Sequence, residues 1–165
     1  MKKLITLLVI AVLAMSAVAF ADTYSANALT FEYSKDYFTI SMEDHTGDED
    51  LIILSDKYDG FVHMHYGVLK DGESFPTAEE VEKNMNVKVE KMDDWANFKD
   101  VLTYDISAED GQKESVFIAP VYNKDKVEGI LTVRISAGKV EGEEKAIENS
   151  DKISEVVDTL VVKEK

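Results

Sequence analysis

The sequence predicts a single α+β domain in which an antiparallel β-sheet is covered by helices. Apolar and polar residues alternate over several short segments, which is typical of half-buried strands. Two other segments carry apolar residues at spacings of three and four, which is typical of helices that pack one face on a core. No proline-rich or serine-rich linker and no internal repeat divides the 165 residues. We therefore expect one domain over residues 22–165, with the order β-β-β-α-β-β-β-α-β.

Strands are expected in three regions before the first helix. Alternation over Leu29–Met42 is interrupted only by a turn at Ser34-Lys35-Asp36. The apolar run Leu51–Leu54 is typical of a well-buried strand. After a second turn, the residues of Phe61–Val68 alternate again, so that its even-numbered residues form one face of a strand.

The hydrophilic stretch Glu43–Asp50 is expected to be an exposed loop, because none of its residues is suited to a core. Its acids do not form an EF-hand, since a count from Asp44 places Glu49 where glycine is needed and Ser55 where the bidentate glutamate is needed. A weak, irregular calcium site remains open beside the simpler interpretation of a solvated loop.

The first helix is predicted to begin near Thr77. Thr77-Ala78-Glu79-Glu80 has the spacing of a capping box, in which the threonine and the glutamate three residues later satisfy two backbone N–H groups. Apolar residues then recur at spacings of three and four up to Ala96, so we expect the helix to continue that far. These residues are Val81, Met85, Val89, Met92 and Ala96.

Three further strands and a second helix are expected after this helix. The strands are Phe98–Ile106, Ser115–Tyr122 and Val127–Ile135, joined by short hairpin connections at 109–112 and 123–126. Pro120 lacks an N–H group, so its strand should lie at a sheet edge or contain a bulge there.

The second helix is expected within Glu143–Asp158, and Ser150 either caps or kinks it. Leu160–Val162 should form a short closing strand. The residues expected to share the apolar face of the helix are Ile147, Ile153, Val156 and Val157.

Residues 1–21 are predicted to be a signal peptide that is cleaved after Ala21. Met1-Lys2-Lys3 is a basic n-region, and Leu4–Met15 is an apolar h-region. Ala19 and Ala21 are the small residues that signal peptidase requires. An uncleaved anchor is the alternative, because Leu4–Ala21 could form a short spanning helix. We expect a secreted or periplasmic protein with no membrane span after signal cleavage.

Composition excludes several classes of partner. The chain has 33 Asp and Glu residues against 18 Lys and Arg residues, and its formal net charge is −15. Nucleic acid is not an expected partner, because a phosphate backbone is bound by basic patches, and anionic membrane surfaces are disfavoured for the same reason. The chain has no cysteine, so disulfides and thiolate metal sites are excluded and packing must hold the domain together.

The order of elements, the opening Leu29–Ile40 and the closing Ile153–Lys163 resemble the PsbP/Mog1-like superfamily of α/β/α sandwich domains. This chain departs from the pattern of that superfamily at Ser34, where a proline is usual, and at Phe38, which lies near the usual tryptophan. The resemblance implies a non-enzymatic adaptor or binding protein. It transfers no functional residue to a position of this chain.

His63 and His65 are the candidate metal ligands. Two histidines two positions apart on a strand place both imidazoles on one face, where they could hold a divalent metal together. A third ligand would have to come from Glu43, Asp44 or His45 on the preceding loop. The alternative is that both histidines face solvent or are covered by a helix.

Known catalytic motifs are missing from the sequence. It contains no Gly-x-Ser-x-Gly elbow, no phosphate-binding glycine loop and no zincin helix. We therefore expect a non-enzymatic binding or accessory protein of the cell envelope or extracellular space, with another protein or an envelope component as its partner and no cofactor. A periplasmic metal-binding protein that uses His63 and His65 is the alternative, and an unrecognised hydrolase is a third hypothesis.

Overall fold

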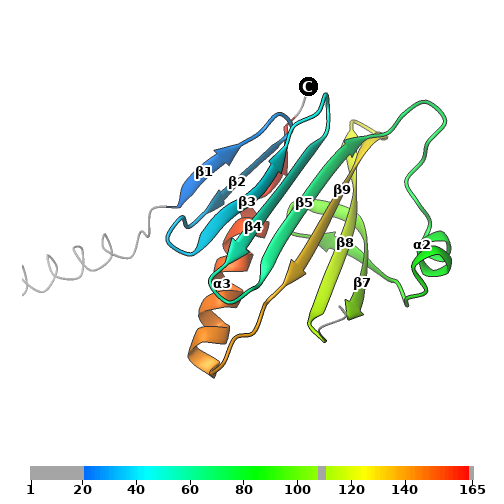
Figure 1. Ribbon diagram of the computed structural model, residues 1–165. Helices are drawn as coiled ribbons and strands as arrows, with labels where there is room; N and C mark the ends of the chain where they lie inside the picture. Colours follow the sequence, from blue (N-terminus) through cyan, green and yellow to red (C-terminus); the bar gives the residue numbers. More distant parts are fainter. Residues whose placement is uncertain (1–20, 108–110, 164–165) are drawn as a thin grey trace, which may run out of the picture.

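The computed structural model describes residues 21–107 and 111–163, which form ten strands and two helices (Figure 1). The strands before the first helix are β1 (Asp22–Ser25), β2 (Leu29–Tyr33), β3 (Phe38–Asp44), β4 (Asp50–Asp56) and β5 (Phe61–Val68). Helix α2 (Ala78–Met85) is followed by β6 (Glu90–Trp95), β7 (Phe98–Ser107), β8 (Lys113–Asn123) and β9 (Lys126–Ser136). Helix α3 (Glu143–Thr159) and β10 (Val161–Val162) end the described chain.

The strands form two antiparallel sheets, which confirms the mixed α+β class. A large sheet has seven strands in the order β3-β4-β5-β9-β8-β7-β6 (Figure 1). A small sheet has three strands in the order β1-β2-β10. Every pairing of neighbouring strands in these sheets is antiparallel.

The main core lies between the large sheet on one side and the small sheet with α3 on the other. Ile52, Val62 and Leu131 point from the large sheet into this core and are completely buried. Phe31 of β2 and Val156 of α3 meet them from the other side and are also completely buried. We call the face of the large sheet that points away from this core the outer face.

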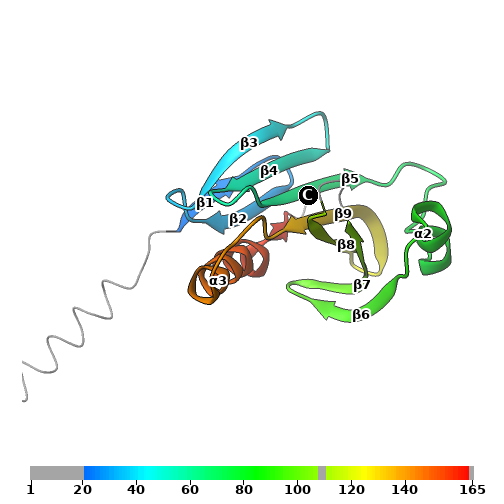
Figure 2. The same cartoon turned by 60° about the horizontal axis from the view of Figure 1, so that its bottom comes forward.

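Helix α2 packs on the outer face, at the β7 and β8 end of the large sheet. Side chains alternate along β8, so Phe117 belongs to the main core while its neighbour Val116 belongs to a second cluster with Val81 of α2. The two helices therefore cover opposite faces, and Figures 1 and 2 show them at opposite sides of the molecule. Neither helix covers the outer face over β4 and β5, which stays open.

Five strands precede α2, whereas the expected order has three strands before the first helix. The turn after β2 separates strands that belong to different sheets, so Leu29–Met42 contains β2 and most of β3. Strand β1, whose four residues pair with β2 from Asp22 to Ser25, was not expected. A strand of that length is too short for alternation to identify it.

The first helix begins as expected and ends eleven residues before its expected end at Ala96. The capping box is confirmed, since Thr77 Oγ1 accepts from the Glu80 N–H and Glu80 Oε2 accepts from the Thr77 N–H. The helix stops at Met85, where Asn86 adopts the left-handed conformation with φ 54°. Residues 90–95, expected to be helical, form strand β6 instead.

The β8–β9 hairpin is confirmed, with Asn123 opposite Lys126. Part of the other expected connection, at 108–110, lies outside the described residues. Pro120 does not lie on an edge strand, because β8 has β9 and β7 as neighbours. However, the pairing of β8 with β7 ends at Ile118, before Pro120. The pairing of β8 with β9 shifts its register just after Val121. Pro120 therefore lies where a missing N–H group costs few ladder hydrogen bonds.

The second helix runs through Ser150 without interruption. Val156 and Val157 are buried as expected, whereas the side chain of Ile147 is 55% exposed because the first turns of α3 extend past the core. The predicted signal peptide lies almost entirely outside the described residues, which begin one residue before β1. No helix in the described part of the chain has the length and apolar character needed to cross a membrane.

Candidate functional site

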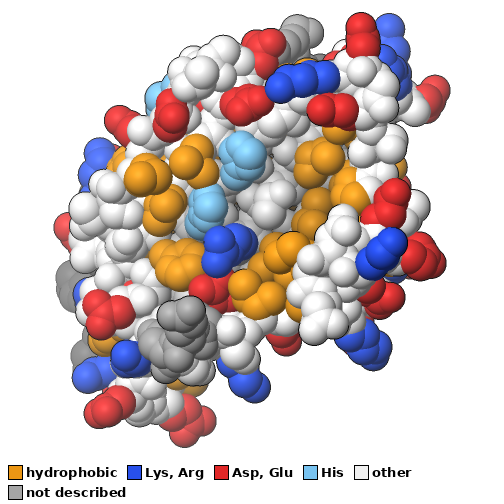
Figure 3. Space-filling model, turned by 45° about the vertical axis from the view of Figure 1, so that its right-hand side comes forward, with side chains coloured by type: hydrophobic (Ala, Val, Ile, Leu, Met, Phe, Trp, Pro, Cys, Tyr) orange, Lys and Arg blue, Asp and Glu red, His pale blue; other side chains and the backbone are white. Residues whose placement is uncertain are grey.

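His63 and His65 lie on the outer face of the large sheet. Strand β5 alternates, so Val62 and Met64 point into the main core and the two histidines point away from it. His63 lies opposite Arg134 of β9, and His65 lies opposite Thr132. Figure 3 shows this face: two histidines lie in its hollowed centre, with hydrophobic side chains on both sides.

A hollow of about 510 Å³ opens on this face beside His63. This volume is within the range of about 300–1,000 Å³ that small-molecule sites usually have. Its walls combine apolar, acidic and basic groups from β4, β5, β9 and the β4–β5 turn. The lining residues are Ile53, Ser55, Asp56, Asp59, Gly60, Phe61, His63 and Arg134.

His63 is held neutral by its surroundings. Burial lowers its pKa, and the nearby charges of Arg134 and His65 lower it further, while Glu114 acts in the opposite direction. Its Nε2 atom is shielded from solvent and has no hydrogen-bond partner among the described residues. A neutral imidazole with an unpaired ring nitrogen is the form of histidine that binds a metal.

Arg134 is anchored beside His63 by a carboxylate. Its Nε and Nη2 groups both donate to Oε2 of Glu114, whose side chain is 8% exposed. Because the carboxylate is nearly buried, removing Arg134 would leave an uncompensated charge. The pair fixes the guanidinium over the β8 and β9 strands of the outer face.

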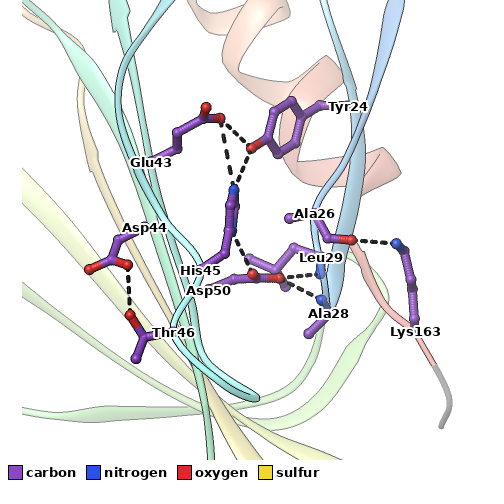
Figure 4. A network of polar contacts seen from close by, with 10 residues as sticks. All are labelled: Tyr24, Ala26, Ala28, Leu29, Glu43, Asp44, His45, Thr46, Asp50 and Lys163. Carbon is purple, nitrogen blue, oxygen red and sulfur yellow. Dashed lines mark hydrogen bonds and ion pairs between the residues drawn. The ribbon is translucent and has the colours of Figure 1, made fainter.

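The candidate third metal ligands do not join the two histidines. His45 and Glu43 meet each other at the junction of the two sheets, and Asp44 accepts a hydrogen bond from Thr46 nearby (Figure 4). Among residues 21–107 and 111–163, no group of three His, Cys, Asp or Glu side chains is placed to hold a metal ion. Metal binding by His63 and His65 therefore stays a prediction, for which the described residues supply no third ligand of these types.

The hollow contains a serine beside a histidine, without the contact that an activated nucleophile needs. Ser55 Oγ donates to Ser41 Oγ at 2.9 Å, and Ser41 Oγ donates to the Ile53 carbonyl. No hydrogen bond between Ser55 and His63 is present in the described part of the chain. Nucleophilic catalysis pairs the hydroxyl with a base within hydrogen-bond reach.

A second cluster of polar groups joins the two sheets (Figure 4). Tyr24 of β1 donates to Glu43 Oε2 at 2.6 Å, and its oxygen lies 3.1 Å from His45 Nε2. His45 Nδ1 lies 2.8 Å from Asp50 Oδ1. We call these four residues, Tyr24, Glu43, His45 and Asp50, the His45 cluster.

Asp50 corrects the expectation that Glu43–Asp50 is an exposed loop throughout. Asp50 is 0% exposed and begins β4, Glu43 and Asp44 end β3, and only residues 45–49 between the two strands form the loop. Its Oδ2 accepts the backbone N–H groups of Ala28 and Leu29. Burial raises the pKa of Asp50, but these two bonds and His45 outweigh that effect and hold the pKa below its usual value.

The phenol of Tyr24 keeps its proton. Burial raises its pKa, and the hydrogen bond to Glu43 together with the Glu43 charge raises it further. A raised pKa makes the phenolate unavailable as a nucleophile, so the His45 cluster is suited to joining β1, β2, β3 and β4 rather than to covalent catalysis.

Comparisons with known proteins add no family. No family model matches the chain, and no curated protein matches it significantly.

Four of the residues described above were not expected at a site. The registers of β9 with β5 and β8 bring Arg134 and Glu114 together beside His63, whereas Tyr24 and Asp50 meet partners that lie in the other sheet. The one available signal was that Arg134 is the only arginine of the chain.

Proposed function

We propose that this protein is an exported, non-enzymatic binding or accessory protein of the cell envelope or extracellular space, and that its partner binds the open outer face over β4, β5 and β9. The observation that carries the proposal is the hollow beside His63 and Arg134, on the part of the outer face that α2 leaves uncovered. A half-open surface of this kind is where a domain without a catalytic motif has room for a ligand.

The composition of the outer face supports this proposal. The chain has 33 acidic residues, yet the outward positions of Leu51–Ser55, Phe61–Gly67 and Ile130–Ser136 carry none. Ile53, Phe61 and Ile130 are only half-buried there, so they present apolar surface beside a guanidinium. Apolar surface of this kind is typical of an interaction site, and the acids that line the hollow, Asp56 and Asp59, lie at its β4–β5 end rather than along these stretches.

The export signal expected in residues 1–21 supports the envelope or the extracellular space as the location. The resemblance to PsbP/Mog1-like domains supports a role in binding rather than catalysis, and we propose membership of that superfamily on the same grounds. Fold resemblance alone does not define a partner, so the outer face is the feature to test.

The experiment places a photo-crosslinking amino acid at His65, which is exposed on the outer face, and at Ile147, which is exposed on α3. Cells expressing each form are irradiated and the adducts are resolved by mass. An adduct formed from position 65 and not from 147 is expected. Ile53→Glu should remove that adduct, while the matched change Ile147→Glu should leave it. Equal labelling from both positions, or none from position 65, would contradict the proposal.

Metal binding by His63 and His65 is the second candidate function. Two observations favour it: His63 Nε2 has no hydrogen-bond partner among the described residues, and the pKa of His63 is lowered. A lowered pKa favours the neutral imidazole, which can bind a metal without first releasing a proton. Titration calorimetry with zinc, copper and nickel should show heat of binding that the double change His63→Ala and His65→Ala abolishes. Heat that persists unchanged in this variant would eliminate the pair as ligands.

A further inference from the structure

A second hollow opens at the far end of β5 from the one beside His63. Its volume of about 380 Å³ also lies within the range of about 300–1,000 Å³ that small-molecule sites usually have. Its walls come from the end of β5, the β8–β9 hairpin and the end of β10, which Figure 1 shows at the end of the molecule marked C. We call it the β10 hollow, and it is lined by Tyr66, Val68, Val121, Tyr122, Asn123, Lys124, Glu128, Val162 and Lys163.

The floor of the β10 hollow is the end of the main core. Tyr66 is 5% exposed and belongs to that core, and three half-buried valines pack against it. Val68 and Val121 come from the large sheet and Val162 from the small one, so the floor lies between the two sheets. The ring of Tyr66 fits there because Gly129 of β9 has no side chain, since a Cβ at that position would lie 2.6 Å from the ring. The β10 hollow is therefore apolar at its base and separate from the outer face.

Two lysines, Lys124 and Lys163, line the same hollow. Neither forms an ion pair in the described part of the chain, where several other lysines do. Lys163 is held in place, because its backbone N–H donates to the Ala28 carbonyl and its Nζ donates to the Ala26 carbonyl (Figure 4). An ammonium group has three hydrogens. Both lysines therefore have hydrogens left to donate to a negatively charged group in the hollow.

The lining of the β10 hollow has the opposite charge balance to the whole chain. It contains two lysines and one acid, Glu128, while the chain has 33 acids and 18 bases. One oxygen of Glu128 accepts from Asn123 Nδ2 at 3.0 Å. Two other acids of this region, Asp100 and Asp125, do not line the hollow, and Asp100 accepts the hydroxyl hydrogen of Tyr122. Acids more than about 8 Å away are largely screened at physiological ionic strength, so the two lysines set the sign of the charge that the hollow accepts.

An apolar floor with two unpaired ammonium groups beside it suits a ligand with an apolar tail and one negatively charged end. We propose that the β10 hollow binds a free aliphatic carboxylate, with its carboxylate at Lys124 and Lys163 and its tail on the valines of the floor. The site lies on the opposite face of the large sheet from His63 and Arg134, so it is independent of the partner proposed for the outer face.

The first test compares three probes by titration calorimetry, each below the concentration at which it forms micelles. Decanoate has both the tail and the negative charge, decyltrimethylammonium has the same tail with a positive charge, and acetate has the negative charge without the tail. Decanoate is expected to bind at one site per chain, while the other two give no heat of binding at the same concentrations. Absence of decanoate binding, or equal binding of decanoate and decyltrimethylammonium, overturns the proposal.

The second test locates the bound decanoate by NMR of the backbone amides. The amides of Val68, Val121 and Val162 are expected to shift on titration, because they surround the floor of the hollow. The amides of Ile53 and His65 on the outer face should not shift. Shifts confined to the outer face would refute the site in the β10 hollow and leave the partner surface proposed above untouched.

The third test changes the charges one at a time. Lys124→Gln and Lys163→Gln should each weaken decanoate binding about two- to fivefold, the effect of one exposed charge pair, and Glu128→Gln should strengthen it by a similar factor. Lys88→Gln is the matched control, because the Lys88 side chain is 84% exposed and does not line the hollow, and it should leave binding unchanged. The proposal is refuted if the three lining variants bind decanoate as the parent protein does, or if Glu128→Gln weakens binding.

Discussion

Replacement of Asp50 is the most direct test of how the two sheets are joined. Asp50→Ala removes the acceptor of the Ala28 and Leu29 N–H groups in a place that is 0% exposed. Each buried donor left without a partner costs about 1–3 kcal/mol, so the free energy of unfolding should fall by about 2–6 kcal/mol. Asp50→Asn keeps one acceptor oxygen and should cost about half as much. A typical domain has only about 5–15 kcal/mol in total.

Urea unfolding followed by Trp95 fluorescence and circular dichroism measures both changes. With an m-value of about 1–3 kcal/mol/M, Asp50→Ala should lower the urea midpoint by about 0.7 M or more. Asp36→Asn is the matched control, because Asp36 is exposed, and its midpoint should be unchanged. The reasoning is refuted if Asp50→Ala and Asp36→Asn unfold at the same urea concentration.

The lowered pKa of Asp50 also predicts how the stability difference between the parent protein and Asp50→Asn changes with pH. The pKa of Asp50 is lowered in the folded state, so its contribution is complete above the unfolded value of about 3.9. It is lost as pH falls from there through the folded value. The stability difference between the parent protein and Asp50→Asn should therefore be constant at pH 5 to 7, which lies about one unit or more above the unfolded pKa. It should shrink at lower pH. A difference that grows on acidification would contradict the lowered pKa.

Three further changes test other parts of the fold. Gly60→Ala should lower the melting temperature, because a Cβ there would lie 2.6 Å from the Ser136 carbonyl oxygen and 2.9 Å from the Ala137 carbonyl carbon; an unchanged melting temperature would show that the β4–β5 turn can move. Asn149→Ala should cost about 2–4 kcal/mol in urea unfolding, since buried Asn149 accepts from Tyr37 and donates to the Ala137 carbonyl; a loss below that of exposed Ile147→Ala would contradict this. Thr77→Ala should cost about 0.5–2 kcal/mol and speed amide exchange at Glu80, and an unaffected Glu80 amide would show that the capping box is not formed in solution.

The start of α2 could be predicted from sequence, and its end could not. A capping box is made by residues three positions apart, so Thr77 and Glu80 contain all the information needed. The apolar spacing of Met85, Val89 and Met92 looked helical because a helix and a following strand happened to place apolar residues three and four apart. The helix ends where Asn86 adopts the left-handed conformation, which an asparagine tolerates but does not by its presence dictate.

The burial of Asp50 shows a different limit. In the sequence Asp50 is the last of a run of hydrophilic residues, and the residues before it are exposed as expected. Its burial is compensated by the N–H groups of Ala28 and Leu29, at the start of β2 and more than twenty residues away in the chain, which both donate to its Oδ2. A buried charge is tolerated where such donors exist, and the position of a donor in another sheet is not written in local composition.

The candidate site on the outer face was likewise predictable from the sequence only in part. Alternation along β5 was enough to place His63 and His65 on one face, because a strand repeats every two residues. Arg134 and Glu114 reach that face through the registers of β9 with β5 and of β8 with β9. A register depends on how all seven strands pair. Local pattern therefore predicts which residues share a strand face. The surroundings that lower the pKa of His63, burial first and the Arg134 guanidinium second, follow only from the complete sheet.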